Sequence, residues 1–501
     1  MGKNRKRNKN QNRADPMNYS HSGGSSINTA LADLFSGINT PEEDIEENKE
    51  VLMGRSRQLA MGNALAISAL KKIRTNVIGS GLKLKASIPA DILGINEEEA
   101  EKIERKLETL WEYWAESTEC DYEGQMNFYQ IQSLAILTKL RDGECFVGLP
   151  FRKNLNDVFE LKLRVLDSAL CVNPSGSSEK VINGVESDSQ GVPIAYHFRK
   201  NYKSMDTVRI SKYGSLTGRQ NILVLMERER AGQKRGVPLL SPVMEELHQV
   251  TKVRRAELKN ILVSTIFSVF VTSPDSKSTL KLKKDFNSLI DEKNEVVKLG
   301  SGTISVLPPG VKIEQANPNR QCASLDSFIT SIAKNIGACL EIPYEVLMSS
   351  FNSSYSASRA ALNEAWRTYM LHREWHIAEF CKPVYAEFLD YIVDSGIIEL
   401  PGYKENLLIK RAYQGSEWFG SSVGQIDPSK EAKAAEIRLR CGLTSLTRET
   451  KLLTGADYET VLKQRRKEAQ NELELNELKR KAREVKGGGE NVMVESGKEK
   501  K

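Results

Sequence analysis

Residues 324–370 read SLDSFITSIAKNIGACLEIPYEVLMSSFNSSYSASRAALNEAWRTYM, and this stretch decides the fold. Its first part repeats apolar side chains at spacings of three and four, which predicts one face of an amphipathic helix. These side chains are Leu325, Phe328, Ile329, Ile332, Ala333, Ile336 and Leu340. Pro343 ends that helix, because proline lacks a backbone N–H and its ring meets the preceding turn. The Ser- and Asn-rich residues 349–358 then predict a loop.

A second, longer helix is predicted after the loop, from about residue 357 to residue 393, with Pro383 bending it. Working outward, helical spacing also predicts helices at residues 59–77, 96–114, 127–140, 243–261 and 427–486. Asn96 with Glu99 three positions on is a pattern typical of a helix start. Short apolar or alternating runs predict strands at residues 82–85, 145–149, 161–166, 194–198, 222–226, 266–272 and 303–307. This order of helices and short strands predicts an α+β fold.

The composition is that of a globular protein of several domains. The chain has 501 residues, 40% of them apolar and 28% charged, with a formal net charge of +6. Its longest uncharged apolar run, residues 261–272, is shorter than the roughly 20 residues that span a bilayer, and no secretory signal opens the chain. Seven cysteines without a C-x-x-C pair predict reduced thiols in a cytosolic protein, at positions 120, 145, 171, 322, 339, 381 and 441.

Two basic groups are candidates for contact with nucleic acid. The N-terminal tail carries Lys3, Arg5, Lys6, Arg7, Lys9 and Arg13 before any acidic residue, followed by an acidic cluster at 42–47. Such a tail either touches phosphate or is simply solvated, and the residues favour neither reading. A second group comprises Arg228, Arg230, Lys234 and Arg235. For this loop, an exposed charged surface is favoured over a phosphate site.

No motif for catalysis stands out. The sequence has no G-x-x-x-x-G-K-[ST] phosphate loop and no G-x-S-x-G nucleophile turn. His372 and His376 are spaced to share a metal on one helix face, but Arg373 and Trp375 occupy the positions where zinc proteases carry their glutamate. An ordinary helix face is therefore favoured. Likewise, the group Glu98, Glu99, Glu101 and Glu104 is typical of a solvated helix surface.

Several segments, in order along the chain, resemble the lambda-like family of phage portal proteins. The central one shows Gly337, Pro343, Tyr344, Glu345 and Leu347, then a Ser/Tyr/Ser loop and a Ser-Arg-Ala helix with Asn363, Glu364 and Trp366. Three others agree, namely residues 57–84, residues 235–242 and residues 427–432. The resemblance covers roughly residues 50–470, and its specificity lies in the collinear set rather than in any single motif.

The resemblance implies a portal-type subunit with an α/β wing, a helical stem, a small α/β clip and a helical crown. It implies a basic then acidic disordered tail at 1–48, the α+β wing at 49–239, stem helices at 240–263 and 314–342, the clip at 264–313, the tunnel-loop region at 343–358, connecting helices at 359–426, a crown-like helical region at 427–486 and a disordered tail at 487–501.

The function implied by the resemblance is that of a non-enzymatic connector between phage head and tail. Copies of the subunit would form a dodecameric ring at one capsid vertex, through which double-stranded DNA is packaged and ejected. The implied partners are the terminase large subunit, the major capsid and scaffold proteins and the head-completion proteins, with the virion and the host cytoplasm during assembly as locations. No cofactor, metal, catalytic residue or membrane contact is implied.

The residues expected to face DNA follow from the same resemblance. The tunnel loop would comprise Phe351, Asn352, Ser353, Ser354, Tyr355 and Ser356. The basic residues of the clip would be Lys277, Lys281, Lys283 and Lys284. An uncharged polar loop suits a channel that must not grip DNA, since every neutralised phosphate adds affinity. The alternatives are a metal-dependent DNA-processing nuclease, and a DNA-binding module acting through the basic tail.

Overall fold

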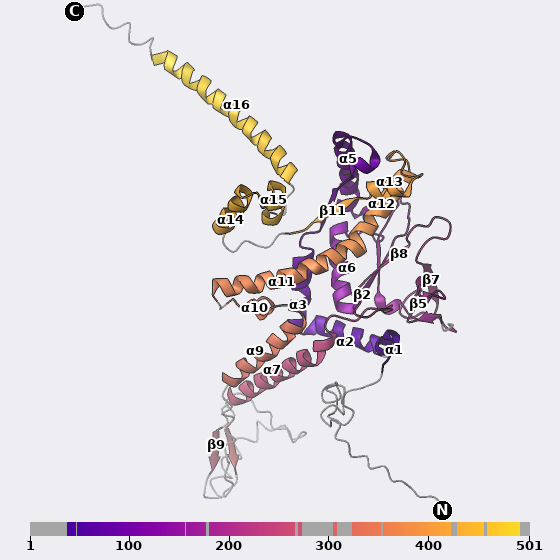
Figure 1. The fold of residues 1–501 in the computed structure, drawn as a ribbon. Coiled ribbons are helices and arrows are strands. Elements are labelled where there is room, and N and C mark those ends of the chain that lie inside the picture. Colours follow the sequence, from indigo (N-terminus) through magenta and orange to yellow (C-terminus); the bar gives the residue numbers. More distant parts are fainter. Residues whose placement is uncertain are drawn as a thin grey trace, which may run out of the picture.

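The structure is a computed structural model of the whole chain. It describes residues 38–46, 48–155, 157–176, 180–265, 269–272, 304–307, 323–351, 354–421, 428–454 and 458–490. A central body of helices and small sheets carries two projections: the helices α7 and α9 with strand β9 beyond them, and the C-terminal helices α14–α16 (Figure 1). Mixed helix and strand agree with the predicted α+β class at that level of detail.

The predicted helix over residues 59–77 is two helices, α2 (Lys49–Gly62) and α3 (Ala64–Val77). Asn63 separates them in an extended conformation, and its side chain accepts a hydrogen bond from the backbone N–H of Ala66 at 3.0 Å. Asparagine at this position satisfies one of the free N–H groups at the start of a helix, which favours a new start over continuation. The apolar face of α3 is fully buried.

Helix α5 (Glu97–Glu116) begins at the predicted capping residue Asn96, and α6 (Phe128–Asp142) begins after residue 127, close to its predicted start. Asn96 accepts from the backbone N–H of Glu99 at 2.8 Å, and Asn127 forms a reciprocal capping box with Gln130. Both helices pack into an aromatic cluster that comprises Trp111, Trp114, Phe128, Phe380, Tyr385, Phe388 and Trp418. Tertiary packing of this kind, rather than helical propensity alone, is what stabilises such helices.

The prediction that Glu104 is a solvated residue is wrong. Its side chain accepts a hydrogen bond at 2.7 Å from the backbone N–H of Ile88, and Glu108 accepts at 3.0 Å from that of Ala86. Both donors belong to the outer edge of strand β1 (Lys83–Ala86) or to the residues just after it. The helix therefore caps a strand edge whose N–H groups have no strand partner on that side, which also keeps that edge from pairing elsewhere.

The described strands form four small sheets. β1 pairs antiparallel with β11 (Ser416–Phe419), and β2 (Glu144–Gly148) lies between β3 (Arg164–Leu166) and β8 (Ile222–Met226). The antiparallel sheet of β4 (Val181–Ile182), β5 (Val185–Ser187), β6 (Pro193–Arg199) and β7 (Thr207–Ser211) packs against Phe146 of β2 and Ile222 of β8 in a second, small apolar core. β9 (Val269–Thr272) pairs in parallel with β10 (Ile304–Leu307).

Shorter helical turns join these elements. They are α4 (Ala90–Leu93), η3 (Thr118–Cys120), η4 (Ser168–Leu170), η5 (Ser241–Val243), α10 (Tyr344–Met348) and α13 (Leu407–Tyr413). Six cysteines lie in the described residues, and all six are free thiols. Four of them are buried, at positions 120, 145, 171 and 381, where they act as small apolar core residues.

The long helix predicted for residues 357–393 is three consecutive segments. α11 (Tyr355–His376) runs into η7 (Ile377–Cys381), a π-helix, which leads into α12 (Lys382–Asp394). The π segment sits in the core and directly precedes Pro383, whose missing N–H and ring are incompatible with regular α-helical hydrogen bonding at that point. The predicted bend therefore has its backbone cause one turn before the proline.

The C-terminal residues form α14 (Pro428–Arg440), α15 (Leu446–Thr454) and α16 (Tyr458–Glu490). Gly442 has φ +69° and ends the first of them, a conformation that glycine adopts without strain. α16 runs through the three glycines at 487–489, beyond the predicted start of the C-terminal tail. An ion pair between Arg359 and Glu431, 2.8 Å long, joins α11 to α14.

The prediction of a structureless tail over residues 1–48 is wrong for its last part, whereas residues 1–37 lie outside the described ranges. Residues 41–46 form α1 (Pro41–Glu46). Its Asp44 pairs with Arg230 and its Glu42 pairs with Lys234 at 3.5 Å. The acidic cluster that suggested a solvated tail is thus the part that binds the chain to the basic loop at 228–235.

A buried cluster of charges joins three parts of the body. Glu144 on β2 accepts three hydrogen bonds from Arg235, the shortest 2.6 Å, and one of 2.6 Å from Lys49 at the start of α2. Burial on its own raises the pKa of the Glu144 carboxyl, but Arg235 and Lys49 outweigh it and lower the pKa to about 2. Burial lowers the pKa of Lys49 to about 8 against the attraction of Glu144.

We expect Glu144→Gln to destabilise the fold strongly, by about 3–5 kcal/mol, because it leaves two buried cations without an anion. Lys49→Met should lower the free energy of unfolding by at least about 2 kcal/mol less than Glu144→Gln does. The reason is that the ion pair of Arg235 and Glu144, which has no net charge, remains in this variant. Urea unfolding of both variants measures the difference. A Lys49→Met variant as unstable as Glu144→Gln would contradict the role given to this cluster.

Candidate DNA-facing helix pair and loop

The helices predicted at 240–263 and 314–342 lie side by side. They are α7 (Met244–Thr265) and α9 (Ala323–Cys339), which contact each other and project together from the body (Figure 1). Leu247 and Val250 of α7 are buried at the base, as are Ala333 and Ile336 of α9. Beyond this base, no described side chain of either helix is buried. The pair is therefore anchored at one end only.

Asn63 anchors α7 to the body. Its amide nitrogen donates to the carbonyl oxygen of Leu247 at 2.8 Å and to Thr251 Oγ1 at 2.9 Å. The same asparagine caps α3 with its other amide atom, so one buried side chain sets the angle between two helices. A buried asparagine satisfied at both ends is costly to replace, because an apolar substitute leaves backbone groups unpaired.

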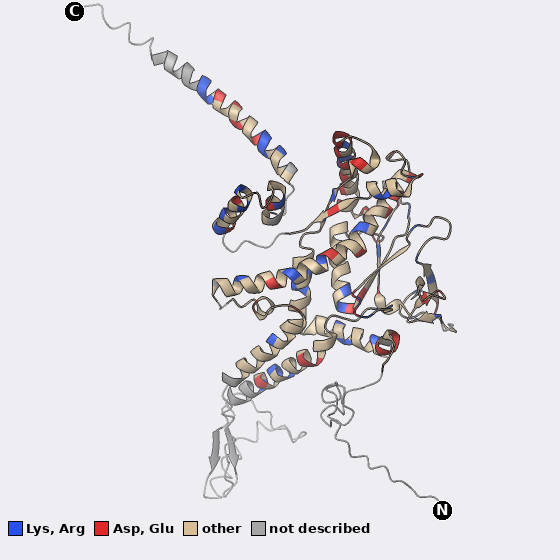
Figure 2. Cartoon of the chain, in the orientation of Figure 1, with Lys and Arg blue, Asp and Glu red and all other residues tan. Residues whose placement is uncertain are grey.

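The outer surface of α7 is basic. Lys252, Arg254, Arg255 and Lys259 are all exposed. Three of them, at 252, 255 and 259, are spaced by three and four residues and therefore share one face. Acidic residues interrupt these charges, with Glu245 and Glu246 at the base of the helix and Glu257 between Arg255 and Lys259, and Figure 2 shows the alternation of blue and red along α7. Within the described part of the helix pair, the face with Lys252, Arg255 and Lys259 is the surface that best suits a polyanion such as DNA.

The predicted tunnel loop is tethered to α3 at its N-terminal end. Lys72 Nζ donates to the carbonyl oxygens of Val346 and Leu347, the latter at 3.1 Å, and to Ser349 Oγ at 2.6 Å. Ser68, one turn earlier, donates to the Leu347 carbonyl at 2.8 Å. A cation at the C-terminal end of α10 is favourable because the helix carbonyls there carry partial negative charge. Partial burial lowers the pKa of Lys72.

The loop itself is shorter than predicted. Ser354 caps α11, accepting from the backbone N–H of Ala357 at 3.4 Å, and Tyr355 and Ser356 already belong to that helix. Phe351 is half exposed, at 49%. Ser349 before it takes a left-handed conformation with φ +53°, which turns the chain away from α10. Asn352 and Ser353 lie outside the described residues.

Other predicted contact residues also lie outside the described ranges. These are the clip residues Lys277, Lys281, Lys283 and Lys284, and the tail residues Lys3, Arg5, Lys6, Arg7, Lys9 and Arg13. Their roles stay predictions.

The basic loop at 228–235 is the exposed charged loop that the sequence favoured only over its first residues, 228–232, whereas its end is buried. Arg235 is 3% exposed and bound to Glu144, and Arg230 and Lys234 pair with α1. Arg228 lies 3.9 Å from Glu379. Every basic residue of this loop thus has an acidic neighbour, and a phosphate would have to compete with it.

His372 and His376 are buried on α11, and neither pairs with a described carboxylate. Burial lowers the pKa of His372 to about 4 and that of His376 to about 3, with the charge of Lys139 adding to both shifts. Both imidazoles are therefore neutral at neutral pH. Neither ring nitrogen of His376 has a hydrogen-bond partner among the described residues. The helix-face reading fits these facts better than a metal site.

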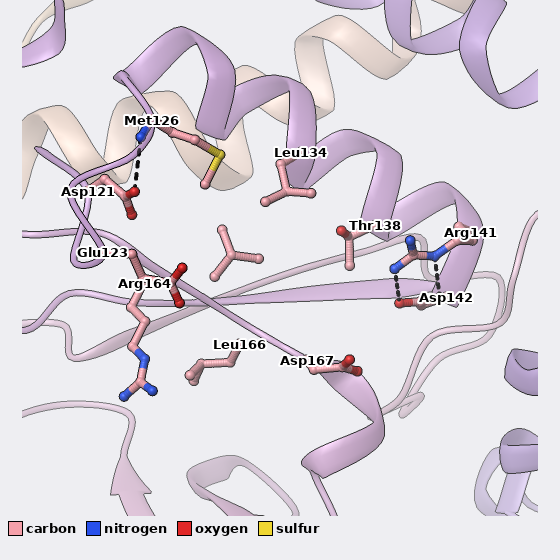
Figure 3. Close-up of a pocket in the computed structure, with 11 residues that line it drawn as sticks. Asp121, Glu123, Met126, Leu134, Thr138, Arg141, Asp142, Arg164, Leu166 and Asp167 are labelled. Carbon is pink, nitrogen blue, oxygen red and sulfur yellow. Dashed lines mark hydrogen bonds and ion pairs between the residues drawn. The ribbon is translucent and has the colours of Figure 1, made fainter. Parts of the chain in front are cut away.

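A surface pocket between α6 and β3 carries several carboxylates (Figure 3). Three of them are engaged: Asp142 binds Arg57 and Arg141, Asp167 binds Arg57, and Asp121 accepts from the backbone N–H groups of Gln125 and Met126. The fourth, Glu123, is exposed. Within the described ranges, no three His, Cys, Asp or Glu side chains are placed to hold a metal ion.

None of the helices in the described ranges is long and apolar enough to cross a bilayer.

Comparison with known sequences gives the family. Residues 28–373 match the family described as phage portal protein, lambda family. This chain belongs to that family. It is 23% identical over 482 residues to portal protein B of Escherichia phage lambda, and 22% identical over 482 residues to the portal protein of Escherichia phage N15. These alignments cover 89% and 90% of this chain and 89% of each relative.

Other matches are more distant. The probable portal protein of Halomonas phage phiHAP-1 is 21% identical over 412 residues, covering 80% of this chain and 76% of that protein. Among solved structures, a chain of the virion of a native gene transfer agent particle matches with a TM-score of 0.44 and 12% identity, covering 81% of this chain and 92% of that one. A chain of the neck of that particle has a TM-score of 0.40.

The predicted family and the portal reading are confirmed, and the nuclease reading is not supported. The portal family is a family of structural virion proteins rather than of known enzymes. Sequence reasoning missed the residues that hold the helix pair and the loop, namely Asn63, Ser68 and Lys72. The only available signal was the pair of polar residues at 68 and 72, one turn apart on a helix that is otherwise apolar on its buried face.

The buried histidines predict how portal stability depends on acidity. Because both pKa values are lower in the folded chain than the ordinary 6.5, the unfolded chain takes up protons first as the pH falls. The free energy of unfolding should drop below pH 6.5 by up to about 1.4 kcal/mol per pH unit for each histidine. His376→Phe should make this slope shallower, whereas His248→Phe, at an exposed position, should leave it unchanged.

Lys72→Met should loosen the loop without unfolding the subunit. Loss of three hydrogen bonds from one ammonium group should speed backbone hydrogen exchange at residues 345–351 about tenfold, equivalent to about 1.4 kcal/mol. Lys71→Met, at the exposed neighbouring position, is the matched control. Equal exchange in the two variants would show that Lys72 does not hold the loop.

Proposed function

We propose that copies of this portal subunit assemble into a closed ring, a dodecamer, at one capsid vertex, and that the α7–α9 pairs form the wall of a channel for double-stranded DNA. The single observation that carries this proposal is the helix pair that is buried at its base and unburied beyond it. Leu258 and Phe328, on the unburied parts of the two helices, are 58% and 50% exposed. Projecting helices with exposed apolar residues need neighbours to cover them.

A ring supplies such neighbours. Rotational symmetry brings one face of each subunit against a different face of the next, and the contact closes after a fixed number of copies. In such a ring the α7–α9 pair of each subunit lies between the α7–α9 pairs of its two neighbours. The basic face of α7 then offers sequence-independent attraction to DNA, while the uncharged loop after α10 adds contact without a strong electrostatic grip.

The remaining roles extend this proposal. The strands β9 and β10, at the far end of the helix pair, belong to the segment proposed as the clip, where the terminase large subunit and later the head-completion proteins would bind. The body would face the major capsid and scaffold proteins. Assembly would take place in the host cytoplasm, and the finished ring would reside in the virion. The family membership and the one-ended anchoring of α7 and α9 support this arrangement.

Electron microscopy of the purified full-length chain tests the proposal. We expect closed rings with a central channel wide enough for a DNA duplex. Replacing both Leu258 and Phe328 by Asp should lower the yield of rings while leaving the unfolding transition of the subunit body in place, because neither side chain belongs to the buried core. Single subunits under all conditions, with or without capsid protein, would refute the ring.

A further inference from the structure

The C-terminal helices have almost no core of their own. Among the described side chains from 428 to 481, only Ala435 and Glu449 are buried. α16 contacts α15 near its start and then stands away from the rest of the chain (Figure 1). Three of its leucines are exposed on this projecting part: Leu473 at 66%, Leu475 at 50% and Leu478 at 63%. No described segment of the same chain reaches them.

These leucines lie on two opposite faces of α16. At 100° per residue, Leu475 and Leu478 are about 60° apart, and Leu473 lies about 170° from their midpoint. A helix that pairs with one partner needs a single apolar stripe. Apolar residues on opposite faces instead suit a helix with one neighbour on each side, as in the wall of a ring.

The charges on the two faces complement each other. Arg466 lies seven residues before Leu473, and Glu468 lies seven residues before Leu475, so each charge shares the face of its leucine. All four side chains are exposed. When two parallel α16 helices stand level, Arg466 of one is about 3 Å higher or lower than Glu468 of the next, because each residue rises about 1.5 Å. Rotational symmetry places equivalent residues of neighbouring copies level, and helices that run along the ring axis are then parallel.

We propose that α16 packs between the α16 helices of two neighbouring copies, with the Arg466–Leu473 face of one helix against the Glu468–Leu475–Leu478 face of the next. The inference rests on the ring proposed above and identifies the partner of this helix as a second copy of the chain. Because α16 has little to pack against in one subunit, its stable folding depends on ring closure. Helices without tertiary contacts are marginal in water, which supports that dependence.

Cysteine cross-linking within purified rings tests the proposal. In a background with Cys322, Cys339 and Cys441 changed to Ser, the double variant Leu473→Cys/Leu475→Cys places one thiol on each face. Oxidation should then give a ladder of covalent oligomers up to the full ring on a denaturing gel. Either single variant, and the same-face pair Leu475→Cys/Leu478→Cys, should stay monomeric, because like faces do not meet.

Charge exchange gives an independent readout. Arg466→Glu and Glu468→Arg each create like charges across the contact and should lower the cross-linking yield several-fold in the double-cysteine background. The combination of the two should restore it. Dimers from a single-cysteine variant would mean that identical faces meet, and would overturn the inference. Intact rings without a ladder would overturn it as well while leaving the ring standing, whereas the absence of any ring would overturn the proposed function itself.

Discussion

The buried carboxylate of Glu144 is the constraint on which the arrangement of this subunit depends. It lies on the central strand of a three-stranded sheet and binds Arg235 from the segment that leads into α7 and Lys49 from the start of α2. Arg235 also donates to the carbonyl oxygens of Ser168 and Cys171, which ties in the loop beside the four-stranded sheet. Once dehydrated, these charges can be satisfied only by one another, so the elements that carry them have one relative placement. The adjoining Gly236 shows how close the approach is, because an added Cβ would lie 2.0 Å from the Gly143 carbonyl oxygen.

Features encoded within a few residues could be predicted from the sequence. The caps at Asn96 and Asn127, the stop at Gly442 and the apolar spacing of α9 depend on neighbours in the chain, and the structure shows all of them. The family resemblance also came from local segments in order. The exact extent of the loop before α11 could not be predicted, because a serine that caps a helix and a serine in a loop look alike until the hydrogen bond of Ser354 is known.

Interactions between distant parts of the chain could not be predicted. Nothing around Arg235 distinguishes a buried partner of Glu144 from a solvated arginine, and nothing around Glu42 or Asp44 indicates that they bind the loop at 230–234. The same holds for Glu104, whose partner is a strand edge in another part of the chain. In each case the sequence shows that the side chain is charged, but only the tertiary fold shows which group it binds, and that group decides whether the side chain is buried or solvated.

The π turn at residues 377–381 has a consequence for everything N-terminal to it. Such a turn holds one residue more than a regular turn, so it rotates the preceding helix by about 100° relative to the one that follows. With that rotation, Ala365 and Tyr369 face the core, and Arg373 reaches the last carbonyls of α3 at Asn76 and Val77. A regular helix through the same residues would rotate this side of α11 away from the core. The extra residue in one buried turn thus determines which face of α11 packs against the core and which face is exposed at its far end.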